Sequence, residues 1–75
     1  MYTACFETDE GSASSTQATA WDAVMAAWDS LQDKDYDLSC SAWVVDGDGN
    51  VKAKAYSAHA PKTFRLLAGL ATDLG

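Results

Sequence analysis

Two alternating runs of residues surround a cluster of turn-forming residues in the middle of the chain. Residues 36–46 and 51–57 change the character of their side chains at every second position, which is the period of a β-strand with one buried face. The residues between the runs include Gly, Asp and Asn, which adopt the backbone conformations of tight turns. The sequence therefore predicts a β-hairpin, with a two-residue turn at Asp48 and Gly49.

This turn sets the register of the hairpin, and with it the face on which each side chain lies. Small and apolar residues then pair on the inner face, and larger residues pair on the outer face. A bulge at the second glycine is an alternative that would shift the pairing near the turn. The expected pairs are Val44 with Ala53 and Ala42 with Ala55 on the inner face, and Val45 with Lys52 and Trp43 with Lys54 on the outer face.

The acidic residues of the turn also invite comparison with a calcium-binding loop. Such a loop has oxygen ligands at positions 1, 3 and 5, glycine at position 6 and a bidentate glutamate at position 12. Asp46, Asp48 and Asn50 match the first three positions, but Val51 and Ser57 occupy the last two. The flanking segments have the period of strands, so we predict a plain turn and no calcium site.

The remaining segments predict one more strand and two helices. Residues 2–8 alternate as a strand does, and residues 9–15 have the small polar composition of a connector. A capping-box spacing from Ser14 to Gln17 places the start of a helix near Thr16, which continues to about residue 33. Pro61 fits the first turn of the final helix. The expected apolar faces contain Trp21, Val24, Met25, Trp28 and Leu31 in the first helix, and Phe64, Leu67, Leu70, Ala71 and Leu74, widened by Leu66, in the second.

These elements predict a single α+β domain over residues 1–75, with the element order β-α-β-β-α and no internal repeat. A helical crossover between the first two strands favours a parallel arrangement, with the third strand antiparallel between them. The expected sheet is thus three-stranded and mainly antiparallel, in the order 1-3-2, with both helices on one face. In this arrangement Cys5 points outward and Cys40 inward, so free thiols are expected.

The charge of the chain favours some partners over others. The formal net charge is −6, and nine of the eleven acidic residues are aspartates. Direct binding to nucleic acid or to an anionic membrane is disfavoured, because both require clustered basic side chains. A basic partner is favoured, although acidity also serves solubility or adaptation to salt. The chain shows no signal-peptide pattern and no membrane span, so we expect a cytoplasmic protein.

Motifs for catalysis and for metal or cofactor binding are absent from the sequence. His59 is the only histidine, and neither cysteine has the spacing of a metal site. No glycine-rich phosphate loop or nucleophile elbow is present. We therefore expect a protein without cofactor or metal that is not an enzyme.

Two surfaces are candidates for partner binding. The first is a stripe of acidic residues that begins on the first helix and extends beyond its C-terminal end, where the helix dipole disfavours negative charge. It consists of Asp22, Asp29, Asp33, Asp35 and Asp37. The second is the outer sheet face, which combines aromatic and aliphatic residues with a lysine. It consists of Trp43, Val45, Lys54 and Tyr56.

The leading hypothesis from the sequence is a small acidic protein that binds and blocks a basic surface of a larger partner. A partner surface that binds nucleic acid would suit a row of carboxylates, which can stand in for phosphates. Small phage-encoded inhibitors of host defence, including anti-restriction and anti-CRISPR proteins, share this general character, an analogy of type rather than of motif. The alternative is a homodimeric structural or regulatory module that associates through the open sheet face around Trp43.

Overall fold

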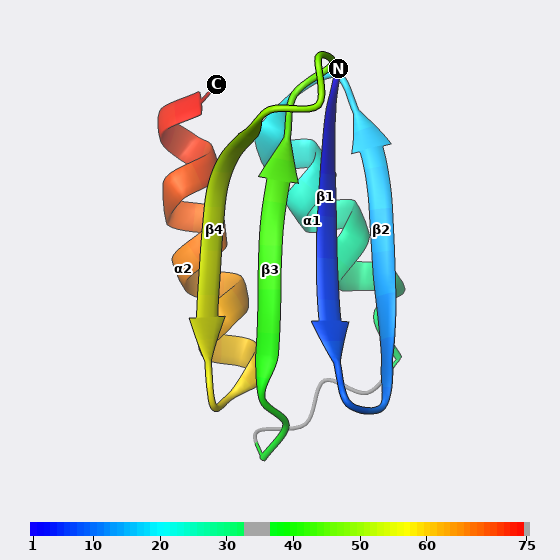
Figure 1. Cartoon of the computed structure of the whole chain (residues 1–75), viewed down its shortest axis with the longest axis vertical. Helices are drawn as coiled ribbons and strands as arrows, with labels where there is room; N and C mark the ends of the chain where they lie inside the picture. Colours follow the sequence, from blue (N-terminus) through cyan, green and yellow to red (C-terminus); the bar gives the residue numbers. More distant parts are fainter. Residues whose placement is uncertain (33–36, 75) are drawn as a thin grey trace.

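The computed structural model describes residues 1–32 and 37–74, which form one four-stranded antiparallel sheet and two helices. The strands lie in the order β2-β1-β3-β4, and both helices cover the same face of the sheet (Figure 1). The predicted α+β class and the placement of both helices on one face are therefore confirmed. In chain order the elements are β1 (Tyr2–Thr8), β2 (Gly11–Gln17), α1 (Ala20–Ser30), β3 (Cys40–Val45), β4 (Val51–Ser57) and α2 (Ala60–Leu74).

Strand β2 is the element that the sequence does not predict. It pairs with β1 along its whole length, from Tyr2 opposite Gln17 to Thr8 opposite Gly11. Its sequence, GSASSTQ, has a single apolar side chain, so its composition is that of a loop. Pairing with β1 supplies hydrogen bonds to a backbone that has little apolar surface of its own to bury.

The predicted strand order 1-3-2 is wrong, because β1 pairs directly with β3 and the two strands are antiparallel. The crossover helix α1 starts from β2 and not from β1. Since β2 and β3 are both antiparallel to β1, they are parallel to each other. The rule that a helical crossover joins parallel strands therefore holds, but it applies to a different pair of strands.

Helix α1 begins four residues later than predicted, at Ala20. Thr19 is its N-cap, and its side-chain Oγ1 accepts a hydrogen bond from the backbone N–H of Asp22 at 3.1 Å. The helix ends at Ser30, so it does not reach residue 33. The Ser14 to Gln17 spacing is not a capping box, because both residues belong to β2.

The chain consists of two successive ββα units, a repeat that the sequence does not predict. The helices correspond position by position: residues 20, 23, 27 and 31 are buried, and so are the residues forty positions later, 60, 63, 67 and 71. Only the first of these four pairs is identical, with Ala20 matching Ala60. The units share a pattern of burial and not a pattern of amino acids.

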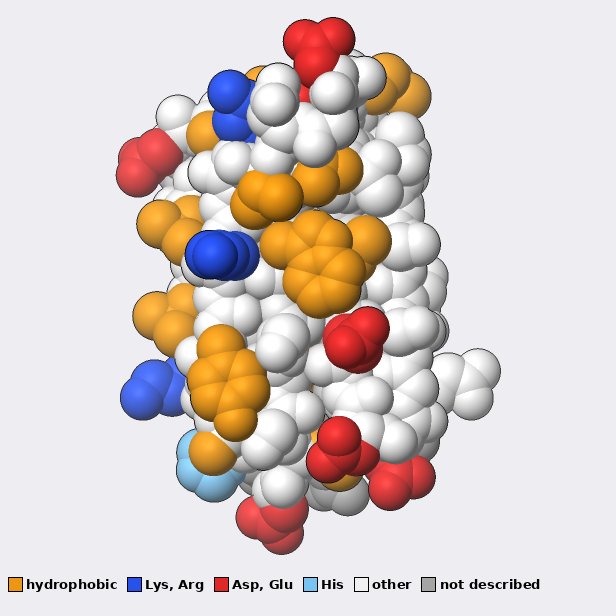
Figure 2. Space-filling view, in the orientation of Figure 1, with side chains coloured by type: hydrophobic (Ala, Val, Ile, Leu, Met, Phe, Trp, Pro, Cys, Tyr) orange, Lys and Arg blue, Asp and Glu red, His pale blue; other side chains and the backbone are white. Residues whose placement is uncertain are grey.

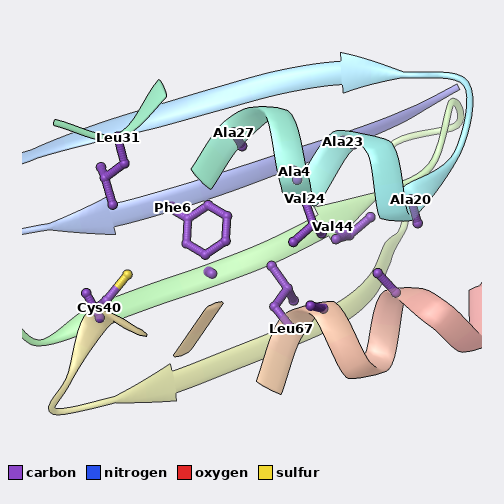
Figure 3. Close-up of a cluster of buried hydrophobic side chains, with 14 residues drawn as sticks. Ala4, Phe6, Ala20, Ala23, Val24, Ala27, Leu31, Cys40, Val44 and Leu67 are labelled. Carbon is purple, nitrogen blue, oxygen red and sulfur yellow. The ribbon is translucent and has the colours of Figure 1, made fainter. Parts of the chain in front are cut away.

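The core is filled by aromatic rings in a setting that is rich in alanine. Phe6 is fully buried, and its ring centroid lies 5.4 Å from Trp28 and 6.4 Å from Phe64. Trp28 and Phe64 stack with a centroid distance of 4.7 Å, which joins α1 to α2. Figure 3 shows Phe6 on its strand with Ala27 of α1 and Leu67 of α2 on either side.

Three large residues that the sequence assigns to apolar helix faces are exposed instead. Trp21 is 44% exposed, Leu66 46% and Leu70 43%. The inner face of α1 is formed largely by alanines, so large apolar side chains in the sequence do not mark this face. On α2 the inner face runs through Ala60, Thr63, Leu67 and Ala71, which leaves Leu66 and Leu70 on its flank.

We expect Phe6→Ala to destabilise the fold far more than Trp21→Ala. Removal of the fully buried ring should lower the free energy of unfolding by about 3–5 kcal/mol, a large part of the stability of a domain of this size. Trp21 is a matched aromatic control, because nearly half of its surface is already in water. Urea unfolding, followed by circular dichroism, measures both values, and equal losses would contradict this description of the core.

Candidate interaction surfaces

The face of the sheet opposite the helices is uncovered (Figure 1). The strand register places the side chains of this face in transverse rows. Trp43 lies at the centre, opposite Cys5 on one side and Lys54 on the other, so the predicted pair of Trp43 and Lys54 is confirmed. The neighbouring rows are Thr3, Val45 and Val51 towards one end, and Glu7, Ser41 and Tyr56 towards the other.

An apolar hollow of 590 Å³ lies on the β3–β4 side of this face. Two of its lining residues are well exposed, Tyr56 at 67% and Val51 at 58%. Figure 2 shows hydrophobic side chains gathered on this face, with basic and acidic groups beside them. Such a surface suits contact with a protein partner. The lining residues are Ser41, Ala42, Trp43, Val51, Lys54, Ala55 and Tyr56.

The turn between β3 and β4 is organised by the carboxylate of Asp46. Its Oδ1 accepts backbone hydrogen bonds from Asp48 at 2.9 Å and Asn50 at 3.0 Å, while Oδ2 lies 3.6 Å from Lys52 Nζ. The hydrogen bond from Asn50 is the main reason that the pKa of Asp46 lies below its usual value. The acidic side chain therefore serves as an acceptor for the turn.

A bulge at this turn alters the predicted register by one pair. Gly49 has a φ of 86°, and its N–H donates to the Asp46 carbonyl at 3.1 Å. Val45 therefore faces Val51, and the predicted pairing of Val45 with Lys52 is wrong. The pairs further from the turn keep the predicted register. The Asp46 N–H donates to the Asn50 carbonyl at 3.0 Å, so three residues, 47–49, form the turn in place of the predicted two. The positive φ of Gly49 fits such a turn, and the extra residue of the bulge is Lys52 on β4, so the bulged alternative holds near the turn.

The predicted acidic stripe lies only partly within the described residues. Asp22 lies in the first turn of α1 and Asp29 just before its last residue, and both are exposed. Their separation along the helix is about 10 Å, from seven residues of helical rise. Asp37 is exposed and precedes β3, whereas Asp33 and Asp35 lie outside the described residues.

The fold instead gathers acidic residues at one end of the molecule. Glu7, Asp9 and Glu10 belong to the β1–β2 hairpin, and Thr8 of this hairpin pairs with Cys40 near the start of β3. The residues at the end of α1 line a hollow together with Glu10, which places that helix end beside the hairpin. We call this region the acidic end. It comprises Glu7, Asp9, Glu10, Asp29 and Asp37.

The hairpin acids were missed because the β1–β2 turn is not visible in the sequence pattern. The alternation of β1 by itself places Glu7 on the open face, and the turn then places Asp9 and Glu10 at the tip. The salt bridge between Lys52 and Asp46 lies at the opposite end of the sheet. All five residues of the acidic end are exposed.

The two ββα units differ sharply in charge. Residues 1–32 contain five acidic residues and no lysine or arginine. Residues 37–74 contain four acidic residues and four basic ones, which are Lys52, Lys54, Lys62 and Arg65. One edge of the sheet is therefore part of a purely acidic unit, and the other edge carries the basic side chains.

The cysteines and the histidine occupy separate positions. Cys5 lies on the open face and Cys40 is buried in the core, and both are free thiols. Burial raises the pKa of both thiols, and the nearby charge of Glu7 raises that of Cys5 further. His59 is exposed, and its carbonyl accepts a hydrogen bond from the Lys62 N–H at 3.0 Å at the start of α2.

The described part of the chain offers few features for other kinds of site. Within it, His, Cys, Asp and Glu residues form no group of three or more that could hold a metal ion. Its helices are also too short or too polar to cross a lipid bilayer.

The lowered pKa of Asp46 predicts a specific pH dependence. A carboxyl group with a lowered pKa contributes stability above its usual value of 3.8, and this contribution is lost as the pH falls through the folded-state pKa. Asp46→Asn retains an acceptor oxygen but lacks the charge, so its stability should fall less over this acid range. Urea midpoints of both proteins across the range measure the difference.

Asp48→Asn is the matched control, because the turn uses the backbone N–H of Asp48, whereas it uses the carboxylate of Asp46. This variant should keep the acid dependence of the parent protein. Identical pH profiles for the parent and Asp46→Asn would show that the carboxylate is not a charged acceptor in the turn.

Comparison with known proteins found no matching family model, no similar curated protein and no similar solved structure. A function for this chain therefore has to be inferred from its own charge distribution and exposed side chains.

Proposed function

We propose that this chain is a protein-binding module that occupies a basic surface of a larger partner, with the acidic end as its main contact. The observation that carries the proposal is the segregation of charge between the two ββα units. Residues 1–32 hold acidic side chains without any basic ones, so this half of the molecule has an unbalanced negative field. Such a field attracts basic surfaces and accelerates association with them.

The acidic end also suits the mimicry of nucleic acid. Carboxylates from the β1–β2 hairpin and from the segment before β3 are grouped on one rigid end, much as phosphates are grouped along a backbone. A partner that uses its basic surface to bind nucleic acid would be blocked by this contact. Small phage-encoded inhibitors of host defence act in this general way, and this analogy of type defines the class of partner that we propose.

A second candidate function is homodimerisation through the open sheet face around Trp43. Its support is the combination of an apolar centre, formed by Trp43, Val45 and Val51, with Glu7 and Lys54 beside it. Opposite charges at the margin of an apolar patch allow a second copy to pair without like charges meeting. Aromatic residues at such a centre commonly supply much of the binding energy.

Reversal of charge at the acidic end should abolish partner binding. Asp9→Lys with Glu10→Lys changes two exposed residues at the tip of the β1–β2 hairpin. We expect proteins captured from a lysate by the parent chain to be lost from this variant, with an affinity at least about tenfold lower. Capture should also weaken as salt rises and be competed by duplex DNA.

The matched control is Asp48→Lys with Asp73→Lys, which makes the same change in net charge at the opposite end of the molecule. This variant should capture the same proteins as the parent chain. If both double variants bind equally well, or equally poorly, the acidic end is not the contact surface and the proposal fails.

Dimerisation through the open face predicts a different response. Trp43→Ala should convert a dimer to a monomer in sedimentation equilibrium, because loss of a central tryptophan costs about 2 kcal/mol or more, roughly thirtyfold in affinity. Trp21→Ala is the matched control, since Trp21 is an exposed tryptophan that lies on α1, behind the sheet. A parent chain that sediments as a monomer would exclude this candidate.

A further inference from the structure

Strand β4 forms one edge of the sheet, and apolar surface borders it on both faces. In the strand order β2-β1-β3-β4 it has a neighbour on one side only, so its outer backbone groups lack a strand partner. The hollow of 590 Å³ lies on its open face, and a second hollow of 420 Å³ lies between β4 and α2. Both hollows are lined by Lys54 and Ala55, so they meet at the edge itself.

Helix α2 extends beyond this edge. In Figure 1 it lies outside β4, so a strand added next to β4 would have α2 behind it. Leu66 and Leu70 line the hollow on this side, at 46% and 43% exposure. A side chain added at Gly69, between them, would meet no other atom within 4 Å. The space beside β4 is therefore open and lined by leucines.

The first ββα unit shows that the fold does not require these residues. Forty positions earlier than Leu66 and Leu70, helix α1 has Ala26 and Ser30. The matching positions on the β2 edge are likewise small or polar, with Ser14 in place of Lys54 and Thr16 in place of Tyr56. Two edges with the same backbone arrangement thus differ in their side chains, and only the β4 edge carries large apolar groups.

The charge around β4 selects the kind of segment that could add there. All four basic residues of the described chain lie on β4 and α2, where Lys54 and Arg65 line the hollow beside the edge. Pairing of β4 with the β4 strand of a second copy would bring lysines of both copies together. A segment with acidic side chains would instead be attracted.

We propose that the β4 edge binds an extended segment of a partner protein in which apolar residues alternate with acidic ones. The segment adds as a fifth strand, and its main chain hydrogen-bonds to the free edge. Because side chains of a strand alternate between faces, its apolar residues contact Leu66 and Leu70, while its acidic residues lie on the open face beside Lys54. This contact is independent of the acidic end and lies on the other ββα unit.

The test uses the capped peptide Glu-Val-Glu-Val-Glu-Val-Glu and the whole chain labelled with ¹⁵N. We expect the peptide to shift the amide signals of β4 and α2 and to leave those of β2 unchanged. Leu66→Ala with Leu70→Ser gives α2 the residues that α1 has at the same positions. Nearly half of each leucine is exposed and neither belongs to the buried core, so this variant should fold. Its affinity for the peptide should be at least about tenfold lower.

Modified peptides separate strand addition from simple apolar or charge contact. Only alternate N–H groups of an added strand face the edge. One of the two N-methylated peptides, methylated either at the valines or at the glutamates, should therefore lose binding, while the other should keep it. The peptide Lys-Val-Lys-Val-Lys-Val-Lys should not bind, because its charge matches that of β4.

Several results would overturn the proposal. These are equal binding of both methylated peptides, equal binding by the double leucine variant, or the absence of shifts in β4 at the solubility limit of the peptide. A dimer of the parent chain that the double leucine variant abolishes would show that a second copy occupies the edge instead. Peptide shifts confined to the acidic end would likewise contradict it.

The charge-reversal variant Asp9→Lys with Glu10→Lys should bind the peptide at least as well as the parent chain does.

Discussion

The packing of Phe6 against Trp28 and Phe64 is the interaction on which the rest of this structure depends. Phe6 comes from β1, one of the two central strands, while the two partners come from α1 and α2, so one aromatic cluster joins the sheet to both helices. Most other buried residues are alanines, which bring the helices close to the sheet but bury little area each. In this small core Phe6 is the largest fully buried side chain, and Trp28 and Phe64 pack against it.

Around this cluster the two ββα units use the same backbone plan for different surfaces. The first unit is wholly acidic in its charged residues, and its edge strand carries serine and threonine. The second unit carries the basic residues of the described chain, and its edge is bordered by Tyr56, Leu66 and Leu70. Because burial constrains only the inner faces, the outer faces of the two units are free to diverge. The acidic end and the β4 edge are the two results of that divergence.

Much of the second unit could be predicted from the sequence, and much of the first could not. The runs around the β3–β4 turn alternate clearly, so the pairing of Trp43 with Lys54 and the separation of the two cysteines follow from periodicity. Strand β2 has no such signal, because Ala13 is its only apolar residue. Because β2 was not predicted, the β1–β2 turn was not predicted either. Asp9 and Glu10, which lie in that turn, were therefore left out of the candidate surface. Asp33 and Asp35, which the sequence hypothesis included, lie outside the described residues.

The sequence by itself determined the elements whose side chains carry a periodic signal: strand β1, the hairpin of β3 and β4, and the two helices on one face of the sheet. Only the tertiary structure decided the strand order, the existence of β2, the bulge that places Val45 opposite Val51, and the gathering of acidic residues from separate segments. The physical reason is that periodicity reports which face of an element is buried, whereas pairing depends on hydrogen bonds between distant backbones. A strand such as β2, held largely by its neighbour's backbone, leaves little trace in its own amino acids.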